Sequence, residues 1–173
     1  MDPSGFGAIL IPWTIRIGLA AYLIALVDQL LGNSTRWARV AWTIGALACV
    51  LHIALAMQYK HDWSNAAAYD DTARQTREMI GLNWGGGIYI NYLFAGVWLA
   101  DALWWWIAPL SRAARPRWLA WLVHGFLAFI IFNATVVFKS GPTRWTAVAA
   151  CLALGLLACV AVRRPRLRSA TDA

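Results

Sequence analysis

The sequence predicts an all-α membrane protein, a bundle of five transmembrane helices that form a single membrane domain over residues 1–173. Two observations predict this class. Hydrophobic residues make up 61% of the chain and the mean hydropathy is +0.55, which is more apolar surface than a soluble domain of this size buries. The apolar residues also fall into five stretches, each near the roughly 20 residues that a helix needs to cross the hydrocarbon. The predicted spans are about 8–31, 37–59, 87–109, 117–139 and 144–162.

Turn-forming residues separate these stretches. Gly32, Asn33 and Ser34 follow the first span, and Pro109 and Pro116 bracket the loop after the third. Ser140, Gly141 and Pro142 form a short turn before the fifth. Residues 60–86 are the longest segment between spans.

Basic residues are divided unequally between the two sides that five spans create. One side has nine of them, and the other has five, with none in the N-terminal tail. The nine are Arg36, Arg39, Arg112, Arg115, Arg117, Arg163, Arg164, Arg166 and Arg168, and the five are Lys60, Arg74, Arg77, Lys139 and Arg144. Because cytoplasmic loops carry the excess of Lys and Arg, we expect the N-terminus outside and the C-terminus in the cytoplasm, in a bacterial-type inner (plasma) membrane.

The first span is not expected to be a cleaved signal peptide. No basic segment precedes it, Arg16 interrupts its apolar run, and no small-residue cleavage site follows. The net charge of +7 is explained by loop topology and anionic lipid headgroups, so we expect a lipid bilayer as partner and no nucleic acid.

The outer loop 60–86 is predicted to contain a short amphipathic helix. Ser64 is suited to cap its first turn, and Gly81 is suited to end it after Ile80. Asp70, Arg74 and Glu78 are spaced four residues apart, as in a charge ladder on an exposed helix face. We expect the helix to lie on the outer surface.

His52, Asp101 and His124 lie well inside predicted spans, away from the boundaries, where an ionisable side chain is costly. Asp101 and His124 lie about 10 to 12 Å from the cytoplasmic boundary, at a rise of 1.5 Å per residue, on spans joined by a short loop. We therefore predict that they form an ion pair or hydrogen-bonded pair. Such a pair serves either as a proton relay or as a lock between two helices.

His52 is predicted to lie in the outer half of span two, on a face of small residues that packs against another helix. A candidate ligand-binding site opens outward near it. Its other members are His61 and the glycine-rich segment that leads into span three, whose backbone a ligand could approach closely. The full set is His52, His61, Trp84, Gly85, Gly86, Gly87, Tyr89 and Asn91. A metal site built from His61, Asp62, Asp70 and Asp71 is a weaker hypothesis.

The function that these features favour is a subunit or homo-oligomeric component of a membrane assembly, with an outward-facing polar site and a proton-relay or transport role. The alternative is a membrane anchor that binds haem b or quinone in a redox complex, since histidines in helical bundles are common haem ligands. Enzymatic activity is not favoured, because no serine or cysteine is placed beside a suitable base in a loop.

Overall fold

The computed structural model describes residues 3–31, 33, 35–137 and 141–163, and the regular structure in these ranges is helical. The all-α class is therefore confirmed. The elements are α1 (Pro3–Leu30), α2 (Arg36–Lys60), α3 (Asn65–Ile80), α4 (Gly87–Ile107), α5 (Pro109–Ala113), α6 (Arg117–Phe132), the π-helical turn η1 (Asn133–Val137) and α7 (Pro142–Arg163).

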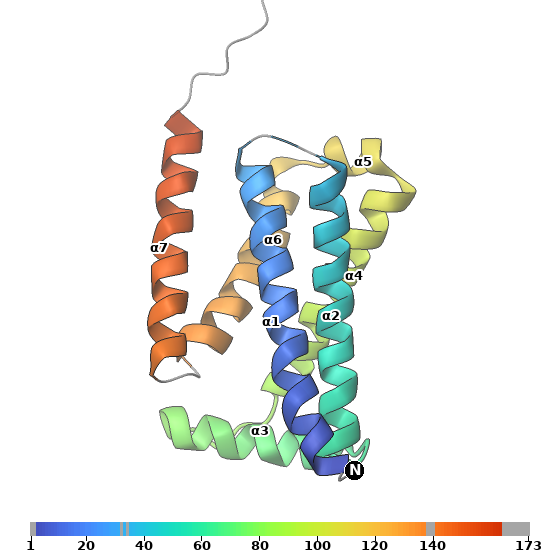
Figure 1. Cartoon of the computed structure of the whole chain (residues 1–173), viewed down its shortest axis with the longest axis vertical. Helices are drawn as coiled ribbons and strands as arrows, with labels where there is room; N and C mark the ends of the chain where they lie inside the picture. Colours follow the sequence, from blue (N-terminus) through green and yellow to red (C-terminus); the bar gives the residue numbers. More distant parts are fainter. Residues whose placement is uncertain (1–2, 32, 34, 138–140, 164–173) are drawn as a thin grey trace, which may run out of the picture.

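The long helices form an upright bundle with short elements at its two ends (Figure 1). Helices α1, α2 and α4 pack side by side, α6 runs obliquely behind them, and α7 stands at the edge against η1 and α1. Helix α3 lies across one end, here called the α3 end. The opposite end contains α5 and the connection from α1 to α2, and is called the α5 end.

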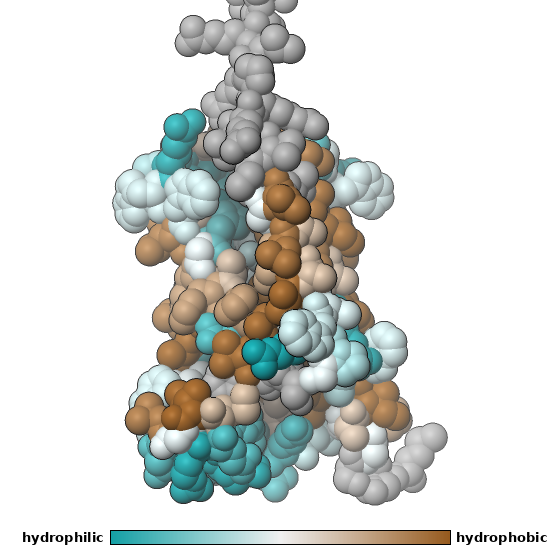
Figure 2. Space-filling model, turned by 90° about the vertical axis from the view of Figure 1, so that its left-hand side faces the viewer, coloured by the Kyte–Doolittle hydropathy of each residue, from teal (hydrophilic) through white to brown (hydrophobic). Residues whose placement is uncertain are grey.

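Among the described residues, three helices are long and apolar enough to cross a membrane: Gly5–Leu30, Arg36–Lys60 and Arg117–Val137. The apolar helix Arg144–Leu156 is shorter. Helix α4 falls outside this group because Asn91, Asp101 and four tryptophans reduce its hydropathy. The structure thus supports three candidate spans, and five spans with a fixed orientation remain a prediction. In Figure 2 the middle of the visible face is largely hydrophobic, while hydrophilic residues gather at the α3 end.

Helix α3 forms where the sequence predicts it. The Ser64 hydroxyl accepts a hydrogen bond from the Ala67 backbone N–H and caps the first turn. At the other end Gly81 adopts a left-handed conformation (φ 75°) and donates its N–H to the Arg77 carbonyl. Both predicted ends are confirmed, because caps are determined by residues within one turn of the helix.

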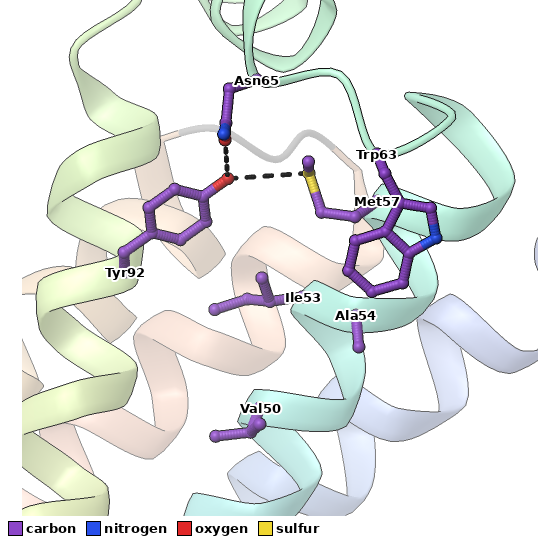
Figure 3. Close-up of a pocket in the computed structure, with 7 residues that line it drawn as sticks. All are labelled: Val50, Ile53, Ala54, Met57, Trp63, Asn65 and Tyr92. Atoms are coloured by element: carbon purple, nitrogen blue, oxygen red, sulfur yellow. Dashed lines mark hydrogen bonds between the residues drawn. The ribbon is translucent and has the colours of Figure 1, made fainter.

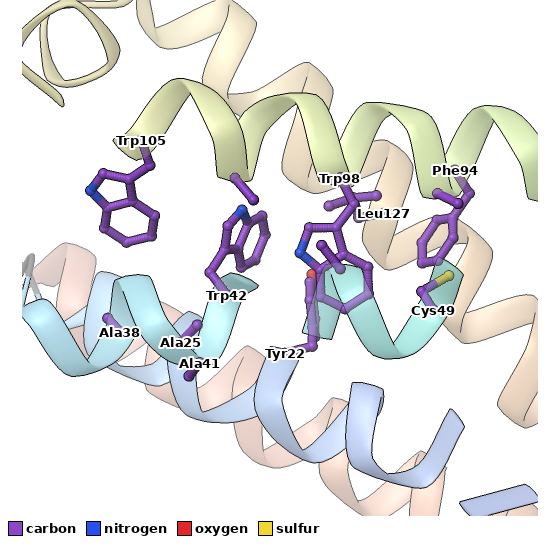
Figure 4. Close-up of a cluster of buried hydrophobic side chains, with 13 residues drawn as sticks. Tyr22, Ala25, Ala38, Ala41, Trp42, Cys49, Phe94, Trp98, Trp105 and Leu127 are labelled. Carbon is purple, nitrogen blue, oxygen red and sulfur yellow. The ribbon is translucent and has the colours of Figure 1, made fainter. Parts of the chain in front are cut away.

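The core lies between α1, α2 and α4 and is built around large aromatic rings (Figure 4). Tyr22 of α1, Trp42 of α2 and Trp98 of α4 have ring centroids 5.5 to 5.7 Å apart. Gly45 makes this packing possible, since a Cβ atom at that position would overlap the Trp98 indole. The small-residue face predicted on span two is buried at Ala41, Gly45 and Cys49. The small residues on α2 therefore leave the space that the Trp98 ring fills in the core.

Candidate functional site

Asp101 is a buried carboxylate at the α5 end, with 4% of its surface exposed. Arg112 donates from Nε (3.1 Å) and Nη2 (2.7 Å) to its Oδ2 atom, and Arg115 donates from Nη1 to its Oδ1 atom. The chain brings these arginines back because α4 ends at Ile107 and the single turn of α5 reverses its direction before α6 begins. Both carboxylate oxygens are thus bound by guanidinium groups, as is typical of a buried ionic lock.

Arg115 also lies between Asp101 and His124. Its Nη2 atom is 3.4 Å from His124 Nε2, and the imidazole ring is 5.3 Å from the Trp42 ring. The structure therefore corrects the predicted direct pair: Asp101 and His124 belong to one cluster, but a guanidinium bridges them. The sequence argument failed here because it compared helix depths and did not include side chains from the loop. A relay role for the two residues stays a prediction.

Positive charge exceeds negative charge in this cluster. The Arg112 guanidinium lies 3.9 Å from the centre of the Trp105 ring. Arg39 of α2 lies 5.9 Å from the same ring and 5.1 Å from that of Trp106. Burial lowers the pKa of Arg112, the Asp101 carboxylate raises it, and the charges of Arg115 and Arg39 lower it further. Two guanidinium groups thus bind the one carboxylate, and a third, that of Arg39, lies near the Trp105 ring that Arg112 also contacts.

Several buried polar atoms near the cluster have no hydrogen-bond partner among the described residues. They include Arg39 Nε, His124 Nδ1 and Trp42 Nε1. Arginine and indole N–H groups only donate, and His124 Nδ1 carries the ring hydrogen when Nε2 accepts from Arg115. The α5 end is therefore rich in donors and poor in acceptors.

His52 faces α1, as predicted for a residue on a packing face. Its Nδ1 atom lies 2.9 Å from the Ile11 carbonyl oxygen and 3.4 Å from the Thr14 hydroxyl. Because a carbonyl oxygen only accepts, Nδ1 carries the ring hydrogen in this contact. His52 thus joins α1 to α2 and does not line the pocket at the α3 end.

A pocket of about 330 Å³ opens at the α3 end between α2, α4 and the turn that leads into α3 (Figure 3). Its walls are mainly apolar, and its polar groups come from Asn65 and Tyr92. The Tyr92 hydroxyl donates to Asn65 Oδ1 at 2.9 Å and lies 3.6 Å from Met57 Sδ. The lining residues are Val50, Ile53, Ala54, Met57, Trp63, Asn65 and Tyr92. Apolar walls with a few polar groups are typical of small-molecule sites.

Backbone strain places the Trp63 ring on one wall of this pocket. Asp62 and Trp63 both have left-handed conformations, with φ angles of 45° and 57°. Such conformations cost roughly 1–2 kcal/mol for a residue with a side chain. The turn is held by the Trp63 N–H, which donates to the Met57 carbonyl, and by the Trp63 indole, which donates to Gln58 Oε1 at 2.9 Å. Strain of this kind is concentrated at binding sites.

The residues predicted to form the outward site do not line this pocket. His61 is half-buried after the end of α2, and Asn91 is exposed. Tyr89 is exposed, and the centre of its ring lies 6.3 Å from the ring centre of Tyr69 and 6.3 Å from that of Tyr92. Through Tyr92 the Tyr89 ring adjoins a lining residue, and an outward site formed by the predicted residues stays a prediction.

The glycine-rich segment is explained by close packing. Gly85 is buried where a Cβ atom would overlap the Tyr69 backbone, and Gly86 is buried beneath the half-exposed Trp84 ring. A Cβ atom at Gly87 would lie only 3.2 Å from the Thr72 methyl carbon. The missing side chains let α3 lie directly against the start of α4. A ligand-binding role for these glycines stays a prediction.

Within the described residues, no group of three or more His, Cys, Asp or Glu side chains is placed to hold a metal ion. The weaker hypothesis of a metal site at His61, Asp62, Asp70 and Asp71 receives no support from this arrangement. The Asp71 carboxylate instead accepts hydrogen bonds from Arg74 and Gln75, while Asp62 and Asp70 are exposed.

Comparison with known proteins gives no match: no protein-family model, curated protein or solved structure matches this chain.

Sequence reasoning missed the pocket wall and the two arginines that hold Asp101. One signal for the wall was present, because Val50, Ile53, Ala54 and Met57 have the spacing of a single helix face. In a membrane helix, however, the same spacing also describes a face that contacts lipid. Arg112 and Arg115 entered the prediction only as loop charges that set topology.

Proposed function

We propose that this chain is a multi-pass integral membrane protein of five spans that works as a subunit or homo-oligomeric component of a membrane assembly. The support is its long apolar helices together with its charge distribution. Arg36 begins α2 at the α5 end, where Arg112 and Arg115 also lie (Figure 1). By the positive-inside rule this end faces the cytoplasm and the α3 end faces outward.

The function proposed for the α3 end is the binding of an amphiphilic molecule with an apolar chain and a small polar group. The observation that carries this proposal is the pocket beside Tyr92. Four residues of one α2 face supply apolar wall, and the Tyr92 hydroxyl and Asn65 amide supply hydrogen bonds at one side (Figure 3). Apolar contact favours the chain, and the polar groups orient the head.

The lining of the pocket also argues against a strongly charged ligand. None of the seven residues that line it is an aspartate, glutamate, lysine, arginine or histidine. Burying an unpaired charge there would be costly, whereas an ester, hydroxyl or protonated acid would be bound by Tyr92 and Asn65. A long-chain monoglyceride, or a long-chain fatty acid in its protonated form, therefore has the chemistry that the site requires.

The test is retention of a monoglyceride by the full chain in lipid nanodiscs, read by native mass spectrometry. Ala54→Trp fills the pocket from α2 and is expected to abolish retention. Ile44→Trp is the matched control, because Ile44 is exposed on the same helix and outside the pocket. If both variants retain as much monoglyceride as the wild type, the pocket is not the binding site.

The proposed assembly is tested separately. The mass of the purified protein in mild detergent, measured by light scattering, is expected to exceed that of one chain, or a second membrane protein is expected to copurify. A lone monomer that is stable and fully folded would contradict the subunit proposal while leaving the pocket proposal intact.

A further inference from the structure

The cluster at the α5 end has a net positive charge that nothing among the described residues balances. Arg112 and Arg115 share the single carboxylate of Asp101. Asp28, the other carboxylate at this end among the described residues, accepts hydrogen bonds from the Thr35 backbone N–H and hydroxyl, both at 3.2 Å, and so belongs to the turn before α2. Positive charges with little access to water need an anion nearby.

Arg39 is the member of the cluster best placed to meet that anion. Its guanidinium contacts two tryptophan rings, but the described residues supply no carboxylate for it. Its Nε atom is buried without a hydrogen-bond partner, while the residue itself is only partly buried. By contrast, the side chains of Arg112 and Arg115 are only 8% and 7% exposed, and both are bound to Asp101.

Tryptophans at this end indicate the depth of the cluster. Trp37 is 79% exposed, and Trp106, Trp118 and Trp121 are 45%, 66% and 74% exposed. Exposed tryptophans on several helices at one level are typical of the membrane–water interface, where lipid phosphates lie. Basic pockets between helices at this depth are suited to acidic headgroups.

We infer that the α5 end binds a phosphate group through Arg39, with Arg112 and Arg115 supplying positive field behind it. The planar guanidinium donates to two phosphate oxygens at once, a geometry that a lysine ammonium does not reproduce. The phosphate belongs either to an anionic lipid of the adjacent leaflet or to a free phosphate ion. The inference is independent of the pocket at the α3 end.

The experiment uses the full chain, purified in mild detergent and stripped of lipid, with three probes: phosphatidylglycerol, phosphatidylcholine and inorganic phosphate. Retention is read by native mass spectrometry, and the melting temperature is measured in parallel. Arg39→Gln is compared with Arg36→Gln, which removes the same charge from an exposed position one turn earlier in α2. Arg39→Gln is expected to lower phosphate-dependent retention by about tenfold or more, since charge-assisted bonds are lost, whereas Arg36→Gln leaves retention near the wild-type level.

Preferred retention of phosphatidylglycerol over phosphatidylcholine identifies a lipid as the source, and stabilisation by inorganic phosphate beyond that by chloride identifies the free ion. Neither effect in the wild type, or equal losses in the two variants, overturns the inference. If Arg39→Gln does not fold, Arg39→Lys and Arg36→Lys take its place. Weaker retention in Arg39→Lys than in Arg36→Lys then supports the site, and equal retention overturns it.

Discussion

The two ends of the bundle differ in how their polar side chains are buried and bonded. At the α5 end a buried carboxylate is surrounded by guanidinium groups and tryptophan rings. At the α3 end one hydroxyl and one amide lie beside an open apolar pocket, and the adjacent turn is strained. The ion pairs around Asp101 depend on every partner being present, whereas the pocket beside Tyr92 leaves groups that an apolar ligand can contact.

Because of this difference, mutations at the two ends are expected to affect different properties. Loss of the Asp101 carboxylate at the α5 end leaves two buried charges unpaired in a place with little water, so its first effect is on stability. At the α3 end, a change removes one hydrogen bond or fills a space, so its first effect is on ligand retention.

The largest effect is expected for Asp101→Asn. Arg112 and Arg115 then remain buried without a counter-charge, a change that typically costs about 3–5 kcal/mol. The melting temperature in mild detergent, or the unfolding midpoint in denaturant, measures the loss. The control is Asp70→Asn, because Asp70 is exposed at the α3 end. If the two variants are equally stable, the Asp101 carboxylate does not stabilise the α5 end more than an exposed carboxylate stabilises the α3 end.

A smaller loss is expected for Gly45→Ala, which tests the aromatic core between the two ends. A methyl group at position 45 would overlap the Trp98 indole, and overpacking of this kind costs typically about 1–3 kcal/mol. Gly96→Ala is the matched control, since a Cβ atom there meets no neighbour and alanine favours the helix. The two unfolding free energies should therefore change in opposite directions, and a similar loss in both would argue against the packing of Trp98 on Gly45.

The sequence predicts features that depend on neighbouring residues. Ser64 caps the start of α3 and Gly81 caps its end, as expected, because a cap is determined by residues within one turn of the helix. The spacing of Ala41, Gly45 and Cys49 likewise predicts a buried face of α2, since helical periodicity alone places them together.

Contacts made through a loop could not be predicted in the same way. Arg112 reaches Asp101 only because Pro109 begins a short helix that reverses the chain. Helical spacing says nothing about such a turn. Helix depth predicts that His124 lies near Asp101, whereas the bridging Arg115 depends on the conformation of the loop and not on depth.

At the α3 end, Tyr92→Phe is expected to reduce stability only slightly. The variant removes the hydrogen bond to Asn65 but keeps the ring, and a single bond of this kind contributes about 0.5–1.5 kcal/mol. Monoglyceride retention should fall more clearly than the melting temperature, because the polar group that orients the head is lost. If stability collapses while retention is unchanged, Tyr92 serves the fold and not the pocket.

The smallest effect is expected on the exposed face of α3, where Asp71 accepts hydrogen bonds from Arg74 and Gln75. Partial burial acts to raise the pKa of Asp71, but these hydrogen bonds and the charge of Arg74 outweigh it and lower the pKa overall. A carboxyl group with a lowered folded-state pKa stabilises the fold at pH values above its unfolded pKa of about 3.9, and this contribution is lost as the pH falls through the folded value. Melting curves of the wild type and Asp71→Asn should thus differ slightly at neutral pH and converge in acid. A difference in melting temperature that grows on acidification would show that folding raises the pKa of Asp71. The ionised carboxylate would then destabilise the α3 end.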